Sequence, residues 1–512
     1  MAVVISADLL MRVLRSRFVD EASARVDLDL SSRLMQKVLN LRLEHRPASV
    51  GSFASTLRGF EQVRDFIASS TVTALIDLPF GLFFVALILW ISPLLAAPVV
   101  LAFSLTVAMG WFLQHRLHAL AESSWRASAQ RNATLIESLA GLETLKAQGA
   151  EGAVQSKWER ANAHLAGIGL QMRALSNAAM LGTSWLAQFT SVAVVVIGVY
   201  LIADRSLTMG ALIAVSMLAS RALAPAGQIV GLLMQYQGAR TALESLDKLM
   251  DTPVERPDDV ANTTHAFVSR GTLKGSIAFR NVTFKYPGRE DAALVDVSFT
   301  INAGDSVAFI GRAGSGKSTI QRLVMGLYQP TSGAVLIDGV DIRQIDPAEI
   351  RRNVASVGQD ALLFYGSLRD NIALGMQHAD DAEVLAAAHA AGLGAFIDKH
   401  PQGLHLQVGE RGEQLSGGQR QAIALARALL HGGSMMCLDE PTSAMDHASE
   451  AFVTQHLKVH AKTRTLLVST HRRTLLPLAS RLIVIDEGRV VADGPRDKVL
   501  LALESVPAVR KP

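Results

Sequence analysis

The sequence predicts a multidomain protein in which an α-helical membrane region precedes a soluble α/β domain. The mean hydropathy over 512 residues is +0.27, with 49% hydrophobic and only 19% charged residues. These values are unusual for a soluble chain and point to membrane segments. The long apolar runs are confined to residues 1–240, whereas the sequence from residue 273 onward has the strand and helix signals of a soluble α/β domain. This composition excludes disordered, collagen-like and coiled-coil proteins.

Four apolar stretches in the first half are each close to the roughly 20 residues that a helix needs to cross a bilayer. They cover residues 72–91, 93–113, 178–202 and 209–233. The short connections after the first and third stretches carry only one basic residue, Arg205, whereas residues 114–173 carry seven. Because basic loops stay in the cytoplasm, we place this long connection there, and the even number of spans places the second half there too.

The long connection between the second and third spans contains few helix breakers. It predicts an out-and-back pair of helices that reaches roughly 45 Å beyond the bilayer. The turn between them should lie near Gly141, Gly149 and Gly152. The chain begins with a short apolar segment that runs into a basic one, which is typical of the tail of a membrane helix. We therefore expect further spans upstream that are missing from this chain.

The boundaries follow from these patterns: a membrane domain at 1–240, a linker at 241–272 and a soluble domain at 273–512. The linker region is polar and contains Pro253 and Pro257. The single cysteine, Cys437, excludes an intrachain disulfide and lies in an apolar run, so we expect it in the core. The net charge is only +3 and no Lys/Arg-rich run is present. We therefore expect a lipid bilayer, and no nucleic acid, as a partner of this chain.

A glycine-rich motif follows the β-rich run at 306–310. The order strand, glycine-rich loop and helix start is typical of a phosphate-binding loop, whose backbone amides surround the phosphates of a nucleotide. We expect Lys317 to reach the β- and γ-phosphates of ATP and Ser318 to coordinate Mg²⁺. The Thr319 hydroxyl is expected at the same anion site. The residues of this candidate ATP site are Gly311, Arg312, Ala313, Gly314, Ser315, Gly316, Lys317, Ser318 and Thr319.

Two further motifs carry candidate chemistry. An apolar run ends in Asp439 and Glu440, which suggests that Asp439 holds Mg²⁺ and Glu440 acts as general base toward water. The alternative is that one carboxylate merely caps a turn. About 20 residues earlier, a serine and two glycines at a helix start predict a second anion site. Two such sites could enclose one nucleotide between two copies of the chain. This second motif consists of Leu415, Ser416, Gly417, Gly418 and Gln419.

With these motifs in this order, the chain resembles an ABC transporter in which membrane and ATPase regions are fused. The resemblance implies that Tyr286 stacks on adenine, that Gln359 senses Mg²⁺ and the attacking water, and that His471 contacts the γ-phosphate. Since every catalytic motif is intact, it also implies a homodimer with two equivalent sites, in which the second anion site contacts ATP in trans. The D-loop of the family matches Ser443, Ala444, Met445 and Asp446.

Longer segments, among them "LIDLPF" and "GLYQPTSGAVLIDGVDIRQIDPAEIRRNV", are similar to type I protein-secretion exporters of RTX-type adhesins and toxins. This narrower resemblance implies a multi-pass protein of the bacterial inner membrane with a cytoplasmic nucleotide-binding domain. It also implies a secreted protein substrate, a periplasmic membrane fusion protein and an outer-membrane channel as partners. The family has six spans, often behind a peptidase-like N-terminal domain.

Our leading hypothesis is therefore ATP-driven export of a protein. A second hypothesis keeps the same architecture but exports a lipid, a peptide or a drug. A third is a soluble ABC ATPase that works on nucleic acid or ribosomes, and the four apolar stretches argue against it.

Overall fold

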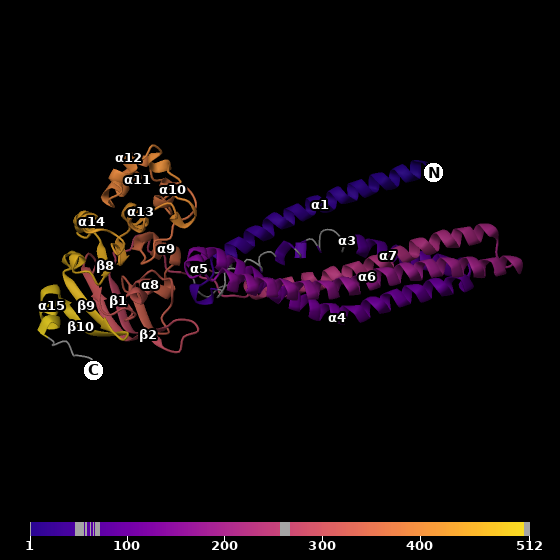
Figure 1. Ribbon diagram of the computed structural model, residues 1–512, viewed down its shortest axis with the longest axis horizontal. Coiled ribbons are helices and arrows are strands. Elements are labelled where there is room, and N and C mark those ends of the chain that lie inside the picture. The colour runs from indigo at the N-terminus through magenta and orange to yellow at the C-terminus, as the bar shows by residue number, and fades with distance from the viewer. Residues whose placement is uncertain are drawn as a thin grey trace. The chain divides into compact units, whose positions relative to one another are not determined.

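The computed structural model describes residues 2–46, 56, 59–61, 63–64, 66, 72–256 and 267–505. The chain divides into two compact units. The first comprises Met1–Leu41 and Arg46–Pro253, and the second comprises Arg42–His45 and Val254–Pro512. The first unit is helical and the second contains both sheets (Figure 1). Part of the expected linker, residues 257–266, lies outside the described residues.

Long helices form the first unit. The described residues give α1 (Ala2–Leu39), α3 (Val72–Ile91), α4 (Pro93–Ala140), α5 (Leu142–Ala147), α6 (Glu151–Ala203) and α7 (Met209–Met250). Among the described residues, α4 and α6 each contain an apolar stretch long enough to cross a membrane, and the shorter apolar segments are Pro79–Ile91 and Met209–Ala224. Each of the four expected spans therefore falls within one helix. Helix α7 continues ten residues past the end expected for the membrane domain.

The turns between these helices follow from local sequence. Ser92 is extended, with φ −159° and ψ 111°, and the proline after it opens α4. Proline favours this first helical position because its missing N–H would have no intrahelical partner there. The predicted turn between the long helices is confirmed, since α4 ends before Gly141 and α6 begins just after Gly149, whose φ is +61°.

The four helices that contain the expected spans share a narrow apolar core. Helices α3, α4, α6 and α7 bury one face against each other; α4, α6 and α7 run side by side (Figure 1). Their other faces remain apolar and exposed: Trp90 is 83% and Trp111 is 77% accessible. An apolar exterior of this kind is expected for helices solvated by lipid. The fully buried core residues include Ile88, Leu95, Val99, Val194 and Val215.

The second unit contains two β-sheets. The antiparallel sheet has the order β2-β1-β4-β5 and the larger sheet has the order β10-β9-β3-β8-β7-β6. The strands of the first sheet are β1 (Ile277–Lys285), β2 (Ala292–Ile301), β4 (Ser332–Ile337) and β5 (Val340–Asp341). Those of the second are β3 (Ser306–Ile310), β6 (Val354–Val357), β7 (Met435–Asp439), β8 (Thr465–Ser469), β9 (Arg481–Asp486) and β10 (Arg489–Pro495).

Helices connect and cover these strands. The α-helices are α8 (Lys317–Val324), α9 (Pro347–Asn353), α10 (Leu368–Ile372), α11 (Asp381–Ala390), α12 (Gly394–Lys399), α13 (Gly417–Leu430), α14 (His447–His460) and α15 (Arg496–Ser505). Short 3₁₀ turns are η1 (Leu43–His45), η3 (Ile342–Gln344), η4 (Gly403–His405), η5 (Glu410–Gly412) and η6 (Arg473–Leu478). Cys437 is completely buried in β7, which confirms its expected place in the core.

Five consecutive strands of the larger sheet, β9-β3-β8-β7-β6, are parallel, and four of them position the site: β3, β8, β7 and β6. Their register aligns the carboxyl ends: Phe309 lies opposite Ser469, and Ser469 lies opposite Asp439. Parallel strands buried on both faces read as apolar runs, and the loops after them gather at one sheet edge. The loops that follow these four strands contain the glycine-rich motif, Glu440, His471 and Gln359, and Asp439 is the last residue of β7.

Gly333 lies in β4 where the backbone of β1 approaches closely. A Cβ atom there would lie 2.3 Å from the Asn281 carbonyl oxygen, and the Gly333 φ is +82°. Gly339 has almost the same φ, +80°, but a Cβ atom on Gly339 would have no neighbouring atom within 4 Å. Replacing either glycine therefore carries the same cost of a left-handed backbone, but only the replacement of Gly333 adds a steric clash.

We expect Gly333→Ala to lower the free energy of unfolding by about 3 kcal/mol, through overpacking added to the left-handed backbone cost. Gly339→Ala should lower it by only about 1 kcal/mol. Thermal melting of the two purified full-length variants measures this difference. Equal melting temperatures would show that the contact between β1 and β4 yields without cost.

Candidate functional site

The glycine-rich loop joins β3 to α8 and places Lys317 at the first helical position. A Cβ atom on Gly311 would lie 2.0 Å from the Ile485 carbonyl oxygen, so only glycine fits this turn. The Lys317 Nζ donates hydrogen bonds to the Gly311 and Arg312 carbonyl oxygens, at 2.9 and 2.8 Å. Ser315 Oγ is buried and has no hydrogen-bond partner among the described residues. The loop therefore offers a lysine and an unsatisfied polar atom that a bound anion can engage.

Asp439 is the last residue of β7 and Glu440 follows it; the two residues are 7% and 9% exposed. Burial raises the pKa of the Asp439 carboxyl, and the adjacent charge of Glu440 acts in the same direction. A hydrogen bond from Ser318 and the charges of Arg322 and Lys317 oppose this shift. Burial lowers the pKa of Lys317, while the two carboxylates raise it. The charges of Lys317 and Asp439 therefore affect each other, although the two residues are more than 100 positions apart.

The donor chemistry here fits a hard divalent cation. The Asp439 carboxylate and the Ser318 hydroxyl are hydrogen-bonded to each other, and oxygen atoms of these two kinds are the ligands that Mg²⁺ accepts. The raised pKa of Asp439 marks a carboxylate that lacks full compensation of its charge. These two residues could hold the metal. Gln359, the third expected ligand, is exposed in the loop after β6, and the described residues show no contact between it and Asp439.

Glu440 and His471 form a direct pair. The His471 Nδ1 lies 2.7 Å from Glu440 Oε1, and the His471 backbone N–H donates to the same oxygen at 3.0 Å. Thr470 Oγ1 donates to the other oxygen at 3.4 Å. Glu440 adopts a left-handed backbone with φ +49°, which is uncommon for a residue with a side chain. This backbone turn and the contacts from the loop after β8 fix the direction of the Glu440 carboxylate.

Tyr286 belongs to an aromatic cluster beside the phosphate loop. Its ring packs edge-on against Phe284 and Tyr328, with centroids 4.8 and 5.3 Å away. Its hydroxyl lies 3.1 Å from Thr319 Oγ1 and accepts a hydrogen bond from Arg322 at 3.0 Å. Thr319, expected at the anion site, is therefore buried against Tyr286. The contact connects the expected adenine-binding aromatic to α8.

The second anion motif opens α13 as expected, with Ser416 as its N-cap. Ser416 Oγ accepts from the Gln419 backbone N–H at 3.2 Å, and Gln419 Oε1 accepts from the Ser416 N–H at 2.8 Å. This reciprocal capping box fixes the helix start. A Cβ atom on Gly418 would lie 3.1 Å from the Ala444 carbonyl oxygen, so the motif lies against the D-loop segment. Asp446 caps α14 by accepting from the Ser449 N–H at 2.8 Å.

Several residues that hold these loops together were not identified from the sequence. Gln421 donates to the Glu440 carbonyl oxygen at 2.7 Å and to Ser443 Oγ at 2.9 Å, while its own Oε1 accepts from the Ala444 N–H at 2.7 Å. Gln321 similarly connects α8 to the ends of β7 and β8. Both glutamines lie on the apolar face of an amphipathic helix, and a polar residue in that position was the sequence feature that could have identified them.

A buried ion pair completes the support. Glu450 is 2% exposed and accepts from Arg472 at 2.8 Å. The same guanidinium donates to the Ser443 carbonyl oxygen at 2.8 Å. Arg472 therefore connects the His471 loop to the D-loop segment. Glu450 and Arg472 are 22 positions apart, and no spacing rule in the sequence relates them.

Models of two protein families match this chain. The model described as "ABC transporter transmembrane region" matches residues 1–224, and the model described as "ABC transporter" matches residues 294–443. The second match contains the phosphate loop, both carboxylates and helix α13 with the second anion motif at its start. Apart from residues 42–45, which belong to the second unit, the first match lies in the first unit, and the second match lies in the second unit.

Curated relatives match nearly the whole chain. The Toxin RTX-I translocation ATP-binding protein of Actinobacillus pleuropneumoniae is 31% identical over 98% of this chain and 70% of its own length. The alpha-hemolysin translocation ATP-binding protein HlyB of Escherichia coli is 30% identical, covering 99% and 71%. The cyclolysin secretion/processing ATP-binding protein CyaB of Bordetella pertussis is 32% identical, covering 97% and 69%. A solved bacterial Atm1-family ABC exporter with ATP bound is 27% identical and covers 98% and 89%, with a TM-score of 0.86.

Asp439→Asn should raise the melting temperature of the nucleotide-free chain at pH 7, by about 2 °C. Because the folded state raises the pKa of this carboxyl, the ionised form destabilises the fold at pH values above the unfolded value, and asparagine removes that charge. The difference should shrink as the pH falls toward 4. Scanning calorimetry over this pH range measures it.

The exposed Asp291 provides the control, because Asp291→Asn removes the same charge outside the site. With Mg²⁺ and ATP added, the order should reverse, since the Asp439→Asn chain loses the stabilisation that ligand binding gives. A lower melting temperature of Asp439→Asn without nucleotide would contradict the proposed electrostatic penalty.

Proposed function

We propose that this chain, which belongs to the ABC transporter family, hydrolyses ATP to drive the export of a protein across the bacterial inner membrane. One observation carries the proposal: four parallel strands of the second unit bring the phosphate loop, the paired carboxylates and His471 to one sheet edge. The same chain carries apolar helices of membrane-spanning length. ATP hydrolysis and a membrane path are therefore present in one polypeptide.

ATP binding uses loop groups that are bonded within the loop or lack a partner when no nucleotide is bound. Lys317 leaves the two loop carbonyls and contacts the β- and γ-phosphates, whose oxygens replace those carbonyls as acceptors. Ser315 Oγ and the loop amides donate to the phosphates. Tyr286 presents its ring to the adenine. Ser318 and Asp439 would hold Mg²⁺, with Gln359 as a third contact, and the metal would neutralise charge on the phosphates.

Hydrolysis needs a base and a group that holds it in place. Glu440 accepts a proton from water as the water oxygen bonds to the γ-phosphorus and the bond to the ADP oxygen breaks. His471 holds the Glu440 carboxylate through two hydrogen bonds and, in this proposal, would also contact the γ-phosphate. Gln421 fixes the Glu440 backbone from behind, so the carboxylate keeps its direction during the reaction.

Two copies of the chain complete the site. Ser416 and Gly418 of one copy contact the γ-phosphate bound to the other, and the D-loops meet between the two sites. Closure lasts only while the γ-phosphate bridges both surfaces, so hydrolysis reopens the dimer. Alternation between the closed and open states drives the membrane helices.

The cargo proposal rests on the relatives, whose names describe translocation or secretion of toxin, hemolysin and cyclolysin. By extension, this chain exports a protein from the cytoplasm. A periplasmic membrane fusion protein and an outer-membrane channel would continue the path. The ATPase unit then faces the cytoplasm, in agreement with the basic connection between the second and third spans.

Glu440→Gln should bind ATP with nearly unchanged affinity but lower the rate of hydrolysis by about 10²-fold or more, because glutamine cannot accept the proton. The trapped nucleotide should also leave a stable closed dimer. Phosphate release and size-exclusion chromatography with ATP measure the two effects. Lys317→Ala, which should lose ATP binding and remain monomeric, serves as the contrast. Near-normal turnover of Glu440→Gln would remove Glu440 from the role of base.

The cargo class has its own test. The C-terminal segment of a protein encoded beside this chain should stimulate ATP hydrolysis by the reconstituted exporter, whereas lipids and drug-like amines should not. Stimulation by lipids or amines alone would favour the second hypothesis of a lipid or drug exporter.

A further inference from the structure

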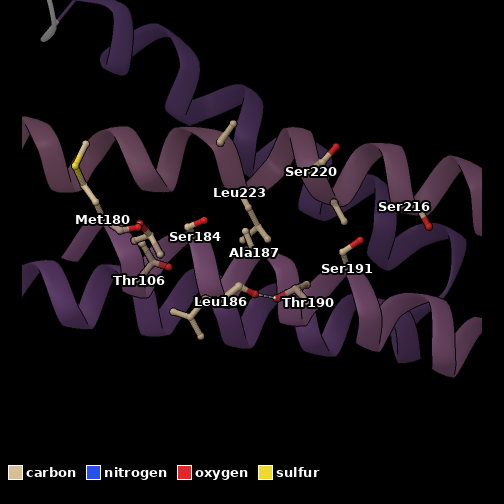
Figure 2. Close-up of a pocket in the computed structure, with 13 residues that line it drawn as sticks. Thr106, Met180, Ser184, Leu186, Ala187, Thr190, Ser191, Ser216, Ser220 and Leu223 are labelled. Carbon is tan, nitrogen blue, oxygen red and sulfur yellow. Dashed lines mark hydrogen bonds between the residues drawn. The ribbon is translucent and has the colours of Figure 1, made fainter. Parts of the chain in front are cut away.

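A hydroxyl-rich pocket lies within the first unit, between α4, α6 and α7 (Figure 2). Its volume is about 370 Å³, which is within the range of small-molecule and peptide subsites. Apolar side chains such as Leu186 and Leu223 form part of its wall. Seven of the lining residues carry a hydroxyl group: Thr106 on α4, Thr183, Ser184, Thr190 and Ser191 on α6, and Ser216 and Ser220 on α7.

The hydroxyl hydrogens of five of these residues are already engaged. Thr190 Oγ1 donates to the Leu186 carbonyl oxygen at 2.7 Å, and Thr106 Oγ1 donates to the Ala102 carbonyl oxygen at 2.9 Å. Thr183, Ser216 and Ser220 make bonds of the same kind within their own helices. Each hydroxyl oxygen retains lone pairs that can accept a further hydrogen bond. The pocket therefore presents mainly acceptors to any ligand.

The apolar segments expected to span the bilayer would place the pocket near its middle. Thr190 lies at the middle of the apolar segment 178–202, and Thr106 lies well inside the segment 93–113. Both side chains are nearly inaccessible, at 2% and 3% exposure. Polar groups are scarce at this depth unless they serve a site or a helix contact. Among the lining residues that the structure describes, none is Asp, Glu, Lys, Arg or His.

We propose that this pocket is a cargo subsite that binds an extended, uncharged segment of polypeptide through its backbone N–H groups. The inference rests on the proposed function, because it names the part of a protein cargo that the membrane helices contact. A polypeptide backbone presents a regular row of N–H donors, which is the complement of an acceptor lining. Asparagine and glutamine side chains of the cargo would supply further donors.

Spacing and wall chemistry favour a peptide over other cargo. Thr183 and Thr190 lie two helical turns apart, about 10 Å along α6, which matches three residues of an extended chain. Among the described lining residues, no cation is present to pair with a lipid phosphate. The stacked Trp185 and Phe189 rings of α6 are not among the lining residues, so a flat aromatic drug finds no stacking partner here.

The test uses the full chain in lipid nanodiscs without nucleotide. The probe is a short peptide of alternating glycine and asparagine that carries a central benzophenone, and mass spectrometry measures its photolabelling of α6 and α7. The double variant Thr183→Val/Thr190→Val removes two acceptors at nearly constant shape. Labelling should fall about tenfold, since two hydrogen bonds of ordinary net strength correspond to that change in affinity.

Thr134→Val/Thr241→Val is the matched control. Both of these hydroxyls make the same bond to a carbonyl oxygen of their own helix, at 3.1 and 3.0 Å, and neither lines the pocket. This variant should label like the parent chain, and a peptide in which aspartate replaces asparagine should label neither protein. Equal labelling of both double variants, or strong labelling by the aspartate peptide, overturns the inference.

Two further measurements separate the possible failures. The basal rate of ATP hydrolysis should be the same in both double variants, so a loss of labelling with intact hydrolysis concerns the pocket alone. An absence of hydrolysis in the parent chain would instead reject the proposed function. Ser191→Cys reports on the remaining occupant, because the native Cys437 is completely buried. A disulfide between two copies at position 191, together with no labelling by the peptide, would show that a second copy and not a peptide occupies this wall, and would overturn the inference.

Discussion

The site depends on the parallel pairing of β3, β8, β7 and β6. This pairing, with Phe309, Ser469 and Asp439 in register, places the ends of the strands at one level. Three catalytic parts of the proposed site then lie at strand ends: the lysine follows β3, the paired carboxylates are at the end of β7, and the histidine follows β8. A shift of one residue in β8 would move His471 by about 3.3 Å and break its bonds to Glu440. The apolar strands that fix this register therefore also fix the geometry of catalysis.

Local sequence predicted the parts of this site whose geometry is local. The order of strand, glycine-rich loop and helix identifies the position of Lys317, and the Ser416 capping box identifies the start of α13. The remainder depends on contacts between distant segments. Glu440 and His471 are 31 positions apart, and their pairing follows from sheet order, which no local pattern contains. Thr319 shows the same dependence: its hydroxyl lies 3.1 Å from the Tyr286 hydroxyl, a contact that the local motif does not contain.

The charges at the sheet edge are arranged for a ligand that carries charges of both signs. Burial raises the pKa of Asp439 and lowers that of Lys317, so the surroundings disfavour the charged form of each group. In the proposed complex a triphosphate would compensate the lysine and a divalent cation would compensate the carboxylates. Lys317 meanwhile stays bonded to two loop carbonyls, which keeps its charge solvated by the protein itself. The fold therefore tolerates an arrangement whose full stabilisation comes only with the ligand.

The membrane helices solve a related problem with neutral groups. A hydroxyl in hydrocarbon is costly when its hydrogen has no acceptor, but serine and threonine can donate to a carbonyl oxygen one turn earlier in the same helix. The five bonds of this kind around the pocket remove that cost inside each helix, and each hydroxyl oxygen retains lone pairs that can accept a further hydrogen bond. The wall can thus be polar although it carries no charge. Charged groups would bind an ionic ligand too tightly for release. A surface of weak acceptors suits a path along which a chain must bind briefly and move on.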